Sequence, residues 1–142
     1  MDIKKHITAL GFVPKNGTNG IYHKIYVDYA IEIDFETQSI NYGSAITAES
    51  KTTQNFSQPE NFVVLECVDR LLTKGYKPQN IVLEKTWPSG HGTSGRLDIS
   101  VNREDGTPYM LIECKTYGKE YNKESAKIHK DGGQLFTYFQ LS

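Results

Sequence analysis

Three charged side chains stand near the ends of two apolar runs in the last third of the chain. Asp98 lies in the run 95–101, and Glu113 and Lys115 close the run 109–115. Because successive side chains of a strand point to opposite faces of a sheet, Glu113 and Lys115 share one face. Each run then has an apolar face that can be buried and a polar face left for chemistry. Two acids and a lysine on paired strands could hold a metal ion and activate a water molecule.

The residue types favour one kind of metal chemistry. Carboxylate oxygens suit Mg²⁺, which takes one or two protein carboxylates and keeps its other positions for water and phosphate. A charged lysine cannot bind the ion. It can orient or deprotonate the attacking water and offset negative charge in the transition state. The leading hypothesis is therefore cleavage of phosphodiester bonds assisted by Mg²⁺, with Mn²⁺ as a possible substitute.

A Glu-x-Lys triplet alone is weak evidence, because surface strands often carry alternating charges. The context strengthens it. The segment 102–108 joins the two apolar runs directly, and its Asp105-Gly106 pair is typical of a tight turn. Antiparallel pairing across this turn would bring Asp98 and Glu113 within reach of each other.

A third segment, 130–140, has the pattern of a helix that begins near Asp131. Gln134 and Tyr138 are four residues apart and share one face of such a helix. They could bind a phosphate backbone or support the site. The alternative is an amphipathic helix in which Tyr138 simply packs.

The three segments together resemble the PD-(D/E)XK nucleases, in the branch that carries a Gln-x-x-x-Tyr helix. The chain resembles more narrowly, over about residues 57–140, the N-terminal nuclease region of type I-like restriction proteins, including those fused to adenine (N-6) DNA methylases. One departure is that Leu97 stands where the first motif has proline. The resemblance implies that Asp98 and Glu113 bind the metal and that Lys115 lies beside the hydrolytic water.

The same resemblance assigns supporting roles to residues outside the two strands. Gln134 would be part of the catalytic site, and Tyr138 and Lys119 would support the site or contact DNA. Many relatives add a glutamate from a helix. Glu60 and Glu66 are the candidates here, although Glu60 is also placed to close a capping box with Ser57, and Glu66 is expected to be solvated.

The order of elements agrees with an α/β, restriction-endonuclease-like fold: a mixed central sheet flanked by helices, with an N-terminal β-hairpin extension. Residues 57–142 would form the nuclease core, with a helix over 60–74 and a first strand over 81–85. Residues 1–56 would form the extension, with a short helix, a hairpin over 20–35 and a short strand at 39–42. Residues 45–58 are polar and predict a linker loop. At 142 residues the whole is expected to be one compact domain.

Composition restricts the environment and the partners. The two cysteines, Cys67 and Cys114, fall in apolar elements and predict reduced thiols of a cytoplasmic protein. No apolar run approaches the length of a membrane span. The net charge is −1, whereas proteins that bind nucleic acid alone usually carry a basic excess.

Double-stranded DNA is nevertheless the expected substrate, with methylase, translocase or specificity domains holding it. The last helix has run only about two turns at Ser142, which favours a fragment of a longer protein. Five lysines could line a phosphate path or form a solvated face: Lys115, Lys119, Lys123, Lys127 and Lys130. A noncatalytic DNA-binding or assembly module on the same fold is the alternative function.

Overall fold

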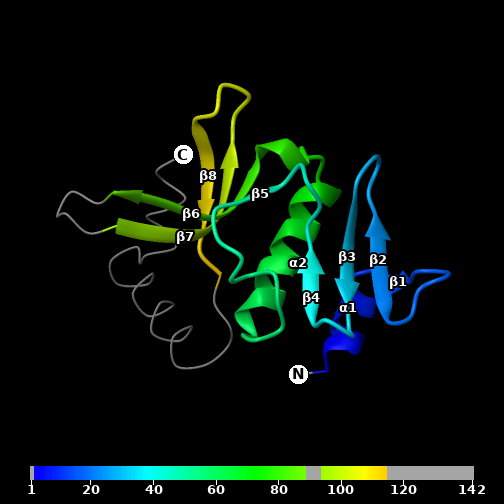
Figure 1. The fold of residues 1–142 in the computed structure, drawn as a ribbon. Helices are drawn as coiled ribbons and strands as arrows, with labels where there is room; N and C mark the ends of the chain where they lie inside the picture. The colour runs from blue at the N-terminus through cyan, green and yellow to red at the C-terminus, as the bar shows by residue number, and fades with distance from the viewer. Residues whose placement is uncertain (1, 89–93, 115–142) are drawn as a thin grey trace.

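The computed structural model describes residues 2–88 and 94–114 (Figure 1). Two α-helices and two four-stranded sheets make up this part of the chain, which is therefore mixed α/β. The first sheet has the order β1-β2-β3-β4 and the second has the order β5-β6-β7-β8. The elements are α1 (Ile3–Ala9), β1 (Val13–Pro14), β2 (Ile21–Ile25), β3 (Ala30–Asp34), β4 (Ser39–Asn41), β5 (Thr47–Ala48), α2 (Glu60–Thr73), a 3₁₀ turn (Pro78–Asn80), β6 (Ile81–Pro88), β7 (Ser94–Asn102) and β8 (Pro108–Ile112).

The N-terminal elements confirm the predicted short helix, hairpin and third strand. Asp2 caps α1 by accepting a hydrogen bond from the Lys5 backbone N–H at 3.1 Å. Gly11 follows the helix with φ +104°, a backbone conformation that glycine adopts without strain. Strands β2, β3 and β4 then pair antiparallel in sequence order. Strand β1 was not predicted, because two residues are too few to show an alternating pattern.

The second sheet is mixed, as predicted. Strands β6, β7 and β8 pair antiparallel, whereas β5 pairs parallel with β6. The expectation of a plain linker over 45–58 was therefore wrong, since β5 lies inside it. Thr47 and Ala48 carry no apolar signal of their own, and their strand conformation depends on pairing with Val82 and Leu83.

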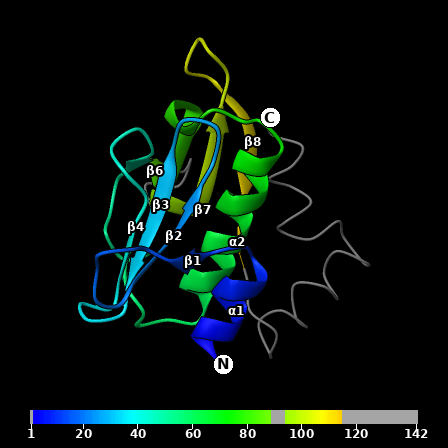
Figure 2. The same cartoon turned by 90° about the vertical axis from the view of Figure 1, so that its right-hand side faces the viewer.

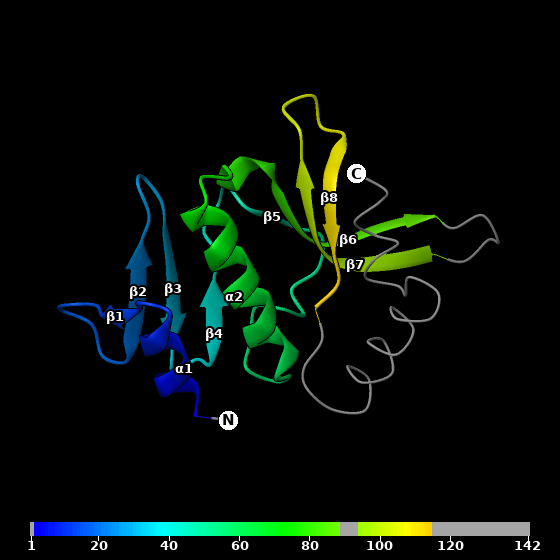
Figure 3. The ribbon, with the colours of Figure 1, turned by 180° about the vertical axis from the view of Figure 1, so that it is seen from behind.

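Helix α2 lies between the two sheets in front and rear views (Figures 1 and 3). After a quarter turn, α1 and α2 are seen on the same side of β2–β4 (Figure 2). One apolar cluster joins α2 to both sheets and includes Phe62 and Leu65 of α2, Ile31 of β3 and Ile99 of β7. Burying such side chains contributes about 1.5–3 kcal/mol each. The N-terminal residues therefore share a core with the rest of the described chain.

The start of α2 differs from the predicted capping box. The N-cap position is Pro59, and no side chain caps the helix there. The Ser57 hydroxyl donates instead to Asn55 Oδ1, which also accepts the Ser57 backbone N–H at 2.9 Å. The Ser57 hydroxyl is therefore engaged in a turn with Asn55 and forms no capping box with Glu60.

A buried polar network ties the first sheet to α2. Asp69 of α2 is 6% exposed, and its Oδ1 accepts hydrogen bonds from Lys24 Nζ and from the Tyr26 hydroxyl, each at 2.6 Å. Lys24 also donates to the Leu10 carbonyl at 2.7 Å. These hydrogen bonds join Asp69 of α2 to Lys24 of β2 and to Tyr26, which directly follows β2, so they fix α2 against β2.

The N-terminal aromatic residues are packing partners. Tyr22 meets Phe35 edge to face, with ring centroids 5.4 Å apart. Tyr29 donates through its hydroxyl to the Tyr42 carbonyl, and Tyr26 is engaged with Asp69. These contacts give the three tyrosines a structural role.

Candidate active site

Strands β7 and β8 bring Asp98 and Glu113 together. The turn between them forms as predicted, with Gly106 at φ +88° and Asp105 Oδ1 accepting the Thr107 N–H at 2.9 Å. Ile99 pairs with Ile112 and Ser100 with Leu111. Continuing this register by one residue puts Asp98 across from Glu113.

A direct hydrogen bond fixes this corner of the site. Asp98 Oδ2 accepts the Cys114 backbone N–H at 2.7 Å. Strand β8 ends at Ile112, before the predicted end at Lys115. The segment that carries Glu113 and Cys114 is therefore held by the Asp98 carboxylate where strand pairing stops.

The two faces of the strands are divided as the alternation predicted. Ile99, Val101 and Cys114 belong to the main apolar cluster, and Met110 and Ile112 pack against it. Leu111 and Ser100, from the other face, are buried outside that cluster. Asp98 and Glu113 are half-buried, and Glu113 Oε2 is enclosed by protein. Burial of this kind strengthens electrostatic interactions with a bound cation.

Glu84 of β6 was not recognised from the sequence. It is 2% exposed and has φ +57°, which is unusual for a residue with a side chain. Its backbone lies between the pairs Leu83–Ile99 and Lys85–Leu97, so its position in the sheet is across from Asp98. Residues held in sparsely populated backbone conformations often lie at functional sites. The signal available was an acid closing the apolar run Ile81–Leu83, the pattern already used for Glu113.

Four predicted site residues lie outside the described part of the chain: Lys115, Lys119, Gln134 and Tyr138. The remaining lysines of the predicted phosphate path also lie there. On α2, Glu66 forms a surface ion pair with Arg70 at 3.8 Å, and its side chain is 35% exposed. This agrees with the partly solvated position expected for Glu66.

The donor chemistry of Asp98 and Glu113 is compatible with a hard divalent cation. Both supply carboxylate oxygens, and Mg²⁺ commonly binds only one or two carboxylates from a protein. Within residues 2–88 and 94–114, no group of three or more His, Cys, Asp or Glu side chains is arranged to hold a metal. The two acids therefore fit a site completed by water and phosphate, and do not form an all-protein metal cage.

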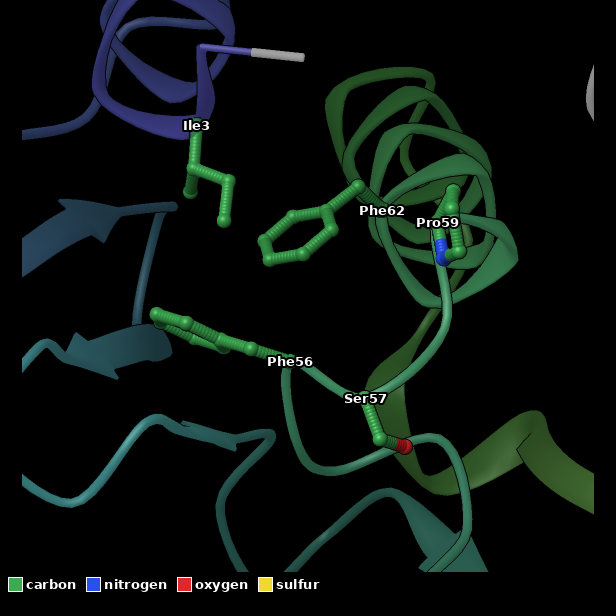
Figure 4. Close-up of a pocket in the computed structure, with 5 residues that line it drawn as sticks. All are labelled: Ile3, Phe56, Ser57, Pro59 and Phe62. Carbon is green, nitrogen blue, oxygen red and sulfur yellow. The ribbon is translucent and has the colours of Figure 1, made fainter.

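A separate pocket of about 240 Å³ lies beside the first turn of α2 (Figure 4). Ile3, Phe56 and Phe62 converge on it, and the rings of Phe56 and Phe62 meet edge to face at 5.2 Å. Ser57 and Pro59 complete the lining. The pocket therefore lies at the junction of α1 and α2, away from Asp98 and Glu113 in the lining that it shows.

Comparison with known proteins places more than half of the chain in one family. Residues 59–140 match the model described as "Type I restriction enzyme R protein N terminus (HSDR_N)". The match covers α2, the three antiparallel strands and every predicted site residue. Comparison with curated proteins gives no match. Neither α-helix of the described chain has the length and hydropathy needed to cross a membrane.

The observed mixed sheet, with helix α2 packed on it, is consistent with a restriction-endonuclease-like fold. The family match extends over that sheet and indicates a role in restriction-modification. The chain belongs to the family of type I restriction enzyme R protein N-terminal regions.

Proposed function

We propose that this chain is the metal-dependent DNA endonuclease part of a restriction-modification system, of the PD-(D/E)XK type. The observation that carries the proposal is the hydrogen bond of 2.7 Å between Asp98 Oδ2 and the Cys114 N–H. It joins the acid of one strand to the residue that lies between Glu113 and Lys115. The hydrogen bond therefore holds Asp98 beside the segment that carries Glu113, and Lys115 follows Cys114 directly in the sequence.

The roles proposed for the residues follow from their chemistry. Asp98 and Glu113 would hold Mg²⁺ or Mn²⁺, which would supply charge stabilisation and a more acidic water molecule when bound. Asp98 is oriented by the Cys114 N–H, which restricts its rotation. Lys115 would orient or deprotonate the attacking water, and Gln134 with Tyr138 would brace the site and the DNA backbone.

DNA affinity is expected to come from elsewhere in the restriction system. The chain has a net charge of −1, whereas affinity for duplex DNA depends on neutralising many phosphates with Lys and Arg. Translocase, methylase or specificity subunits or domains would hold the duplex. The cleavage site would then act on DNA brought to it.

Metal binding tests this function against a noncatalytic DNA-binding or assembly module. Isothermal calorimetry with Mg²⁺ and Mn²⁺ should show binding to the wild-type chain. The Glu113→Ala variant should lose this binding, because one of the two ligands is gone. The Asp105→Asn variant is a matched control, since Asp105 is an exposed acid in the turn between the same strands. Absence of metal binding to the wild-type chain, or equal binding to Glu113→Ala, would favour the noncatalytic module.

Glu84 is proposed as a further contributor to the negative charge of the site. Its carboxyl is buried on the strand adjacent to Asp98. Glu84→Gln keeps the size of the side chain and removes the charge, so metal affinity should fall about tenfold, as for other residues that support metal ligands. Glu66→Gln on the surface of α2 should leave the affinity unchanged.

A Glu84→Gly variant separates the charge of this residue from its backbone strain. Glu84→Gly relieves the positive φ and should lower metal affinity as much as Glu84→Gln. Unchanged metal affinity in both variants would show that Glu84 has only a structural role.

A further inference from the structure

The connection between β1 and β2 contains two asparagines that are each followed by glycine. The pairs are Asn16-Gly17 and Asn19-Gly20. The backbone nitrogen of the next residue can attack an asparagine side-chain amide, and glycine hinders this attack least because it has no Cβ. Asparagine is accordingly among the thermally labile residues of proteins. Because the two pairs have the same chemistry in the sequence, only the structure distinguishes them.

Asn19 and Gly20 are held by contacts with the end of the neighbouring hairpin. The Asn19 amide donates through Nδ2 to Glu36 Oε1 at 2.8 Å. The Gly20 carbonyl accepts the Phe35 backbone N–H at 2.9 Å, directly before β2 begins at Ile21. A Cβ at Gly20 would lie 3.5 Å from Glu36 Cγ, so this glycine is close to the turn between β3 and β4. These contacts restrict both the Asn19 side chain and the Gly20 backbone.

Asn16 and Gly17 are less restrained. Both are exposed, and they occupy the central positions of a turn that the Thr18 N–H closes by donating to the Lys15 carbonyl. This bond is 3.3 Å long, beyond the usual range of about 2.7–3.2 Å, and the Thr18 hydroxyl donates to the same carbonyl at 2.7 Å. Gly17 has φ +78°, and a Cβ built on it would meet no atom within 4 Å. Within the described part of the chain, the Asn16 amide and the Gly17 N–H make no hydrogen bond.

We propose that Asn16 is a site of spontaneous covalent modification, which converts it to aspartate and isoaspartate, and that Asn19 is protected from the same reaction. The Gly17 nitrogen attacks the side-chain carbonyl carbon of Asn16, and a five-membered cyclic imide forms. The amide nitrogen of Asn16 leaves as ammonia with the proton that the Gly17 nitrogen gives up. Water then adds to either carbonyl of the imide and breaks its bond to the Gly17 nitrogen. One asparagine and one water give one aspartate or isoaspartate and one ammonia.

The product places a new negative charge next to an ion pair of the first sheet. Lys15 Nζ lies 2.5 Å from Glu32 Oε2, and both side chains are partly exposed. A carboxylate at position 16 is the direct sequence neighbour of Lys15, so it competes with Glu32 for the charge of that lysine. Isoaspartate also adds one backbone atom to the connection between β1 and β2, which pair through only two residues each. The direct effects therefore fall on the first sheet, and not on β7 and β8.

Mass spectrometry of the folded chain, incubated at mildly alkaline pH in heavy-oxygen water, tests the chemistry. Cleavage after Lys15 and Lys24 releases the peptide 16–24, which contains both asparagines. This peptide should exchange an amide for a labelled carboxyl group, and isoaspartyl methyltransferase should label part of it. Fragmentation of the peptide should show that Asn16 is lost several-fold faster than Asn19. The Asn16→Gln variant is the control and should lack the rapid reaction.

Variants of Glu36 test whether its contact with Asn19 distinguishes the two pairs. Glu36→Ala removes the acceptor of the Asn19 amide and should raise the rate of Asn19 loss several-fold, whereas Glu36→Gln keeps an oxygen acceptor and should leave that rate low. In the chain unfolded with urea, both asparagines should react at similar rates. The proposal is overturned if Asn16 persists in the folded wild-type chain, or if Asn19 is lost there at least as fast. An unaltered rate of Asn19 loss in Glu36→Ala would refute protection by this contact.

Discussion

Asp98→Asn should reduce DNA cleavage by about a hundredfold to a thousandfold, the range for loss of a group that stabilises transition-state charge. Asparagine retains a side-chain oxygen that can accept the Cys114 N–H, so the hydrogen bond seen at 2.7 Å can persist. The change removes the negative charge that a bound cation requires. Plasmid cleavage with Mg²⁺, in the presence of the translocase, methylase and specificity parts of the restriction system, measures the effect.

Two comparisons make the cleavage experiment decisive. Lys115→Ala should also strongly reduce cutting, because the site would lose the lysine proposed to orient or deprotonate the attacking water. Asp105→Asn, in the turn between the two strands, should cut at the wild-type rate. Circular dichroism and thermal unfolding should show a native fold for all three variants, and any methylation by the system should continue. Undiminished cleavage by Asp98→Asn would contradict the proposed site.

Asp69→Ala should lower the free energy of unfolding by about 3 kcal/mol, near the lower end for breaking a buried ion pair. Asp69 accepts from Lys24 Nζ and the Tyr26 hydroxyl, each at 2.6 Å. Its loss leaves the Lys24 ammonium partly buried, with a side chain 23% exposed and the Leu10 carbonyl as a remaining acceptor. Urea unfolding followed by circular dichroism measures the change.

A surface variant and a double variant complete the stability test. Glu66→Ala removes only the exposed pair with Arg70 and should change stability by less than about 0.5 kcal/mol. Replacing Lys24 and Asp69 together by Met and Leu should recover part of the loss, since no buried charge is left without its partner. A cost below about 1 kcal/mol for Asp69→Ala would show that the network does not hold the first sheet on α2.

The same network predicts how stability depends on pH. Burial raises the pKa of Tyr26 above its usual value, and the hydrogen bond to Asp69 and the charge of that group raise it further. The folded state therefore favours the protonated phenol. This contribution is fully present below about pH 10, the ordinary tyrosine pKa, and is lost as the pH rises above it.

Local sequence patterns predicted the elements whose signals lie within their own residues or in the turn beside them. Helix α2 has its apolar stripe and the glycine that follows it, and β7 and β8 show alternation on either side of an Asp-Gly turn. The same alternation predicted that Asp98 and Glu113 would meet, because the tight turn sets the register of the two strands. The resemblance to type I-like restriction proteins over about residues 57–140 also agrees with the family match over residues 59–140.

Other features depended on contacts between distant segments. Thr47 and Ala48 become a strand only because β6 offers backbone groups to pair with. Ser57 does not cap α2, and its hydroxyl donates to Asn55 Oδ1 instead. In the sequence, Asp69 is an ordinary polar residue of a helix. Its role in a buried network is visible only in the structure, where Lys24 and Tyr26 donate hydrogen bonds to it.

The sequence by itself determined which residues could carry the chemistry, since residue type and strand period are local properties. The tertiary structure decided how those residues are supported. It placed Glu84 on the strand beside Asp98 and gave the Asp98 carboxylate the Cys114 N–H as a partner. Both features depend on how β6, β7 and β8 pair in the folded sheet, which residue type and strand period alone do not set.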